Sequence, residues 1–121
     1  MEIGSFPARR MRRLRRAGFF RDLVRENAVT ASDFILPLFV LDHPNAREAV
    51  TSMPGVERLG QGPMLDICER ALRLGIPAVA LFPVIDPDLK SPEGKEAFNP
   101  QGLVPRAVQS IKSRLPELGV I

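Results

Sequence analysis

Short apolar runs alternate with amphipathic helical patterns along this chain, and that alternation limits the folds it can adopt. Residues 34–41 and 78–84 are nearly continuous apolar sequence rich in β-forming residues, as expected for strands covered on both faces. Apolar residues at helical spacing follow each run, over 63–74 and again up to Leu115. A further apolar stretch begins near residue 117. This order predicts an α/β fold of parallel strand-helix-strand units.

Prolines and glycines mark the expected element boundaries. Pro63 suits the first turn of a helix and Gly75 its C-terminal cap. Asn99-Pro100 is a plausible cap for the second helix, but Pro105 would then lie inside it, so that helix either begins there or is kinked. Pro37 is an objection to the first strand, because proline donates no ladder hydrogen bond. Ser52-Met-Pro-Gly55 predicts a turn, with polar residues on both sides forming a loop.

The length sets how much of a larger α/β architecture the chain can contain. A complete (β/α)₈ TIM barrel needs about 250 residues, whereas this chain has 121. Residues 31–121 could therefore supply two strand-helix units and the start of a third strand of such a barrel. One copy of the chain cannot close a barrel.

Residues 1–30 are predicted to form a basic N-terminal arm with a short helix over 19–26. Six arginines gather in it: Arg9, Arg10, Arg12, Arg13, Arg15 and Arg16. Such a cluster could neutralise nucleic-acid phosphates, or it could dock on an acidic surface of another subunit. The chain has no Tyr or Trp, and Phe19-Phe20 lies outside the cluster. A stacking surface for single strands is therefore unsupported, and subunit docking is the favoured interpretation.

Other features exclude whole classes of protein. The apolar runs are much shorter than the roughly 18 residues of a membrane-spanning helix, and the N-terminus lacks the apolar segment of a secretory signal. A single cysteine, Cys68, rules out an internal disulfide and a multi-cysteine metal centre. We expect a cytoplasmic protein.

The loop after residue 84 is where a barrel enzyme would carry functional groups. Asp86 and Asp88 could bind a metal, but hard cations take about six oxygen ligands and a solvated loop explains the pair as well. Lys90 and Lys95 are interpreted as surface lysines, since a Schiff-base lysine needs a dry pocket. Phe82, at the end of its strand, either lines the barrel mouth or belongs to the core.

Three further features have structural explanations that compete with functional ones. His43 could act as a general base, but no nucleophile lies near it in the sequence. Cys68 falls on the apolar stripe of the 63–74 helix, which favours a small core residue over a reactive thiol. Gly60-Gln-Gly62-Pro63 could receive an anion at its amides, although a turn suffices and neither phosphate-loop motif is complete.

Five blocks at consistent spacing closely resemble the N-terminal third of the porphobilinogen synthase (delta-aminolevulinic acid dehydratase) family. They are Arg9-Arg-Met-Arg-Arg-Leu-Arg-Arg16, Ser32-Asp-Phe-Ile-Leu-Pro-Leu-Phe-Val40, Ser52-Met-Pro-Gly-Val56, Leu74-Gly-Ile-Pro-Ala-Val-Ala-Leu-Phe-Pro-Val84 and Asn99-Pro-Gln-Gly-Leu103. The similarity covers nearly the whole chain in order. Pro105 and Gly60-Gln-Gly62-Pro63 depart from the family's usual helix sequences.

The resemblance implies a TIM-barrel lyase of haem and tetrapyrrole synthesis that condenses two molecules of 5-aminolevulinate into porphobilinogen. It also implies two Schiff-base lysines, a zinc or magnesium ion, and a homo-oligomer, usually an octamer, held by the N-terminal arm. The family's catalytic lysines, metal segment and substrate-carboxylate contacts would lie beyond Ile121. Lys90, Lys95 and Lys112 do not match those lysines, and Cys68 does not match the metal cysteines. Only Phe82 is expected to face the active-site mouth, and the chain alone is expected to be inactive.

Overall fold

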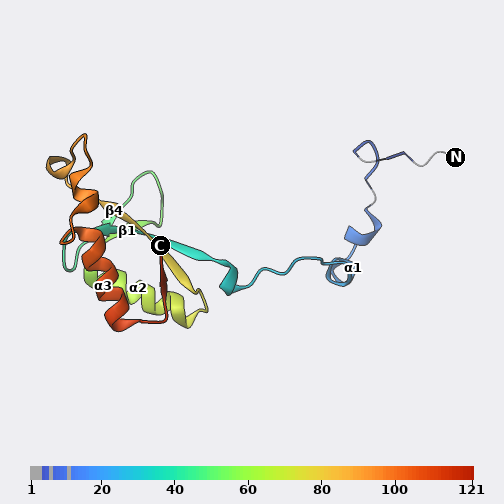
Figure 1. Ribbon diagram of the computed structural model, residues 1–121. Coiled ribbons are helices and arrows are strands. Elements are labelled where there is room, and N and C mark those ends of the chain that lie inside the picture. The colour runs from blue at the N-terminus through green and yellow to red at the C-terminus, as the bar shows by residue number, and fades with distance from the viewer. Residues whose placement is uncertain (1–3, 6, 11) are drawn as a thin grey trace.

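The computed structural model describes residues 4–5, 7–10 and 12–121; residues 1–3, 6 and 11 of the predicted arm lie outside this description. An α/β body follows an N-terminal segment that projects away from it (Figure 1). The described part of the segment carries a 3-10 helix over Arg13–Arg15 and one short α-helix, α1 (Gly18–Leu23), which ends before the predicted C-terminal end of the 19–26 helix. All of its described arginine side chains are exposed.

The body is built on a sheet that is five-stranded over the described residues, in the order β2-β3-β1-β4-β5. The central strands β1 (Ile35–Leu41) and β4 (Ala78–Val84) pair in parallel along their whole length, from Ile35 opposite Ala78 to Leu41 opposite Val84. Helix α2 (Gln61–Arg73) connects them, and α3 (Leu103–Arg114) connects β4 to the parallel strand β5 (Gly119–Val120). The predicted order of parallel units is confirmed.

The segment after β1 contains a hairpin that the sequence interpretation missed. β2 (Arg47–Ala49) and β3 (Glu57–Leu59) pair antiparallel, and β3 also pairs in parallel with the end of β1. The predicted turn is present between them, with Gly55 at a φ of +84°. The expectation of a polar loop was wrong on either side of that turn. Strands of three residues are too short for an alternating pattern to stand out from polar loop sequence.

The two strand prolines lie where the ladder has a neighbour on one side only. β3 reaches Phe39 and Val40 but not Pro37, and β5 reaches Ala78 and Val79 but not Pro83. At these positions a missing N–H costs no bond to a second flanking strand. This local edge removes the objection to β1.

Both helices begin at residues that differ from the predicted ones. α2 begins at Gln61 rather than Pro63, and α3 begins at Leu103 with Gly102 at its N-cap, rather than at Asn99. Pro63 and Pro105 therefore both occupy the third helical position, where the N–H has no partner within the helix. Gly75 ends α2 as predicted, with a φ of +82° and its N–H bonded to the Leu72 carbonyl at 2.9 Å.

The helices cover one face of the sheet and leave the other open (Figure 1). Leu38, Val40 and Val79 point toward α2 and α3 and are buried there with Met64 and Ile111. On the opposite face, Ile35 and Phe82 keep 53% and 50% of their surface exposed. The apolar sequence of these strands predicted that both faces of the sheet would be covered. In this chain only one face is covered. No helix in the described part of the chain is long and apolar enough to cross a membrane.

Candidate active site

The open sheet face ends in a group of aromatic side chains at the carboxyl ends of β1 and β4. Phe39 lies opposite Phe82 in the ladder, and their ring centroids are 5.8 Å apart at an interplanar angle of 45°. Active sites of parallel α/β folds form at this edge, from the loops that follow the strands. Phe82 is half exposed on the open face near the carboxyl end of β4, and its place at an active-site mouth stays a prediction.

A cavity of about 390 Å³ opens at the same edge. Apolar side chains from β1, the hairpin and the end of β4 line it, together with the cations Arg58 and Lys90. Arg58 lies opposite Phe39 in the parallel ladder, so it shares the open face. The sequence analysis did not single out Arg58. Its only signal was its place two residues after Val56 of the Ser52–Val56 block, and without the hairpin that place carries no spatial meaning.

The two aspartates after β4 organise their own loop. The Oδ1 atom of Asp86 accepts a hydrogen bond from the backbone N–H of Asp88 at 2.9 Å and caps a short 3-10 helix over Pro87–Leu89. No group of three or more potential His, Cys, Asp or Glu ligands is found within the described ranges. The pair is thus explained by loop structure, and it does not provide the donor set of a hard-cation site.

The lysines are spread over separate elements. Lys90 borders the cavity, whereas the backbone of Lys95 begins another 3-10 helix and bonds to the Ser91 hydroxyl at 3.2 Å. Lys112 lies near the end of α3, where its Nζ donates to the Leu118 and Pro116 carbonyls. All three residues are exposed. None of them sits in the dry surroundings that make a lysine nucleophilic.

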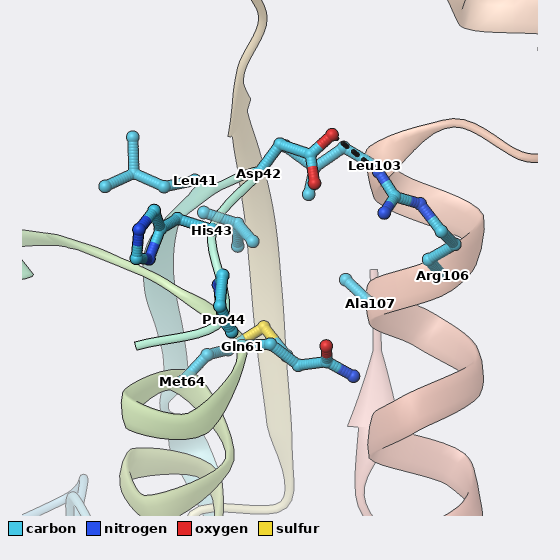
Figure 2. Close-up of a pocket in the computed structure, with 10 residues that line it drawn as sticks. Leu41, Asp42, His43, Pro44, Gln61, Met64, Leu103, Arg106 and Ala107 are labelled. Carbon is cyan, nitrogen blue, oxygen red and sulfur yellow. Dashed lines mark hydrogen bonds and ion pairs between the residues drawn. The ribbon is translucent and has the colours of Figure 1, made fainter. Parts of the chain in front are cut away.

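A second, smaller pocket of about 120 Å³ lies between β1, α2 and α3 (Figure 2). Asp42, just after β1, accepts a hydrogen bond from Arg106 of α3 at 2.7 Å, and this bond and the Asp42 charge raise the pKa of the guanidinium. His43 lies on the other side of the pocket from Arg106, and its Nδ1 accepts the N–H of Asn45 at 3.1 Å. The pocket lining contains no serine or cysteine. These residues join a loop to a helix and do not form a nucleophile pair.

The glycine-rich start of α2 is occupied by the chain itself. The N–H groups of Gly60, Gln61 and Gly62 donate to the carbonyls of Ala46, His43 and Pro44, at 2.8, 2.9 and 2.8 Å. Amides that already have backbone partners cannot cradle an anion. The turn interpretation of this segment therefore fits the structure, and the anion site does not.

Cys68 is fully buried on α2 within the core. Burial raises the pKa of its thiol to about 11. A thiol that stays protonated at neutral pH is a poor nucleophile and metal ligand. The structure accordingly places Cys68 among the packing residues.

Comparison with known proteins identifies the fold around this site. The family model for delta-aminolevulinic acid dehydratase matches residues 8–121. A protein of that name from Bradyrhizobium diazoefficiens is 51% identical over 112 residues, which are 93% of this chain and 32% of the relative. The corresponding protein of Synechocystis is 38% identical, over 96% of this chain and 35% of its own length. This chain therefore spans about a third of the curated relatives it matches.

A solved structure gives the same result in three dimensions. Delta-aminolevulinic acid dehydratase (porphobilinogen synthase) from Toxoplasma gondii, in complex with the reaction product porphobilinogen, matches with a TM-score of 0.83 at 40% identity. The match covers 93% of this chain and 32% of the other. The parallel sheet and its two helices are thus similar to part of a TIM-barrel enzyme.

Proposed function

Because the chain belongs to the delta-aminolevulinic acid dehydratase family, we propose that it supplies the arm and the first part of the barrel of a porphobilinogen synthase. The reaction is the condensation of two molecules of 5-aminolevulinate into porphobilinogen with loss of water. The family match over residues 8–121 carries this proposal. The parallel order of β1, β4 and β5 and the open face agree with one section of a barrel wall.

In this proposal residues 31–121 position the wall and mouth of the active site. Phe82 would line the substrate pocket beside Phe39, with its exposed ring toward the barrel interior. The reacting amines would come from the two thirds of the enzyme that the relatives possess beyond the matched region. A Schiff-base lysine needs a dry pocket. The three lysines Lys90, Lys95 and Lys112 are exposed.

The donor set of the described residues does not fit a zinc or magnesium site, so we derive no step through a metal. The Asp86 carboxylate accepts a backbone hydrogen bond within its own loop, and Asp86 and Asp88 belong to no group of three potential ligands among the residues that the structure describes. A zinc or magnesium ion, as the family resemblance implies, would take its ligands from the remainder of the enzyme.

We expect the chain to be active only when that remainder is joined to it. The test replaces the matching third of the Bradyrhizobium relative with residues 8–121 of this chain and measures porphobilinogen formed from 5-aminolevulinate. The fusion should turn over, and the purified 121-residue chain should not, because covalent catalysis needs nucleophilic amines in their pocket.

Two controls make the result decisive. The unaltered relative sets the reference rate, and the relative without its matching third sets the background. A folded fusion without turnover beside an active parent would refute the proposed function. Turnover by the isolated chain would refute the division of labour between the two parts.

A further inference from the structure

Two cations face the cavity at the carboxyl edge of the sheet without a close counter-ion between them. Arg58 comes from β3, and Lys90 from the loop after β4, so separate elements bring them to one cavity. The apolar residues that line the same cavity, called its apolar floor below, include Phe39, Met53 and Val84. A cavity with an apolar lining and two positive charges is suited to a carboxylate on a short carbon chain.

The described ion pairs leave both cations largely available. Glu48 lies opposite Arg58 in the hairpin, but its Oε2 is 3.8 Å from the Arg58 Nη1 and both side chains are about half exposed. An exposed pair at that separation is weak. Asp86 accepts a backbone hydrogen bond in its own loop, and the described ion pairs do not include Lys90. Each cation can therefore attract a further negative group.

We propose that Arg58 and Lys90 form a gathering site for the carboxylate of 5-aminolevulinate at the barrel mouth. The site holds the acid loosely before it reaches the reacting groups, and the apolar floor contacts its methylene carbons. It is additional to the deeper carboxylate contacts that the family resemblance implies beyond Ile121. 5-Aminolevulinate carries an ammonium group as well as its carboxylate near neutral pH, so positive charge at a cleft acts on its carboxylate end: it attracts and orients that end, and salt weakens this effect.

The inference rests on the proposed function for the identity of the acid, but its first test needs no turnover. The isotope-labelled 121-residue chain is titrated with 5-aminolevulinate and, separately, with its methyl ester, which lacks the negative charge. The acid should shift the NMR signals of the Met53 and Val84 methyl groups and of the Arg58 guanidinium. The ester should bind about tenfold more weakly, as expected for loss of two charge contacts at an exposed site.

Substitutions assign the effect to the two cations. Arg58→Gln and Lys90→Gln should each weaken binding of the acid about threefold. Arg47→Gln is the matched control, because Arg47 lies on the same hairpin at similar exposure but is paired with Glu57 at 2.7 Å. Arg58→Lys keeps the positive charge and should keep the salt-dependent attraction. If it does, the loss of binding in Arg58→Gln comes from the charge and not from a disturbed hairpin. Equal binding of acid and ester, or equal effects of Arg47→Gln and Arg58→Gln, would overturn the site.

The same variants in the active fusion separate this inference from the proposed function. Arg58→Gln and Lys90→Gln should lower kcat/KM about threefold, with kcat unchanged and a flatter salt dependence. If the fusion is active and neither variant alters kcat/KM, the gathering site is refuted and the proposed function is supported. If the fusion shows no turnover but the chain binds the acid in a charge-dependent way, the binding site is supported and the proposed function is refuted.

Discussion

The role of Cys68 is set by its buried surroundings and not by the reactivity of its thiol. It lies on the buried face of α2 with Met64 and Ala71, and none of its surface is exposed. Its raised pKa follows from that burial, because the thiolate would lose its solvation in the core. The sequence placed Cys68 on the apolar stripe of the helix, and the structure confirms that place.

The pKa of Cys68 gives a residue-scale prediction about thiol reactivity. The ordinary value is 9.0 and the folded value is about 11, so the folded state keeps its proton where the unfolded state loses it. Between these values the unfolded state binds fewer protons, and the free energy of unfolding should therefore fall as pH rises above about 9. At pH 8 an aromatic disulfide reagent should modify the native chain far more slowly than the urea-unfolded chain. Equal rates in the two states would contradict the buried position, and Cys68→Ala supplies the blank.

At the scale of elements, the close packing of the 42–46 loop against the start of α2 depends on glycine. A Cβ atom added at Gly60 would lie 2.4 Å from the His43 carbonyl oxygen and 2.8 Å from the Ala46 nitrogen. Both neighbours are backbone atoms and cannot move aside without breaking the hydrogen bonds that hold the loop. Gly60 thus has a local structural role at the start of α2.

Gly60→Ala should lower the free energy of unfolding by about 1–3 kcal/mol, the usual cost of overpacking. Gly18→Ala is the control, because a Cβ atom there meets nothing within 4 Å and alanine favours the helix α1. Urea unfolding followed by far-ultraviolet circular dichroism suits this comparison, since the chain has no Trp or Tyr for fluorescence. A Gly60→Ala variant as stable as the parent would show that the loop can leave the helix at little cost.

At the scale of the whole molecule, two surfaces are left exposed by this chain: the open face of the sheet and the N-terminal arm. The open sheet face keeps Ile35 and Phe82 half exposed, and the arm carries its arginines away from the body (Figure 1). The short helix α1 adds exposed Phe19 and Leu23, at 60% and 78% of their surface. An apolar and basic segment that projects away from the body (Figure 1) is suited to docking on a second copy of the chain. This is our proposal for the predicted homo-oligomer.

Neutralising the arm should weaken assembly of the fusion enzyme. The variant replaces Arg9, Arg10, Arg12, Arg13, Arg15 and Arg16 with Gln, and light scattering after size exclusion should show a smaller mean mass. Arg70→Gln with Arg73→Gln, in the last turn of α2, controls for loss of surface charge. An unchanged mass, with steeply salt-dependent binding to a nucleic acid that vanishes in the arm variant, would favour the nucleic-acid alternative.

The sequence by itself determined the order of the parallel strands and their connecting helices, because apolar periodicity, Gly75 and the proline positions are local signals that survive without tertiary contacts. It also determined that β4 spans 78–84 and that Cys68 belongs to the core. It misplaced the starts of α2 and α3, because a proline is compatible with any position in the first turn. Only the tertiary structure decided where the hairpin of β2 and β3 pairs with the rest of the sheet.

The pairing of β3 with β1 joins residues about 20 positions apart, and no local pattern encodes which residues will be neighbours across that gap. That pairing brings Arg58 beside Phe39 and into the lining of one cavity with Lys90. The same is true of Asp42 and Arg106, which meet only when α3 packs beside the end of β1. Local chemistry therefore determined the elements of this chain, whereas long-range packing decided which side chains share a site.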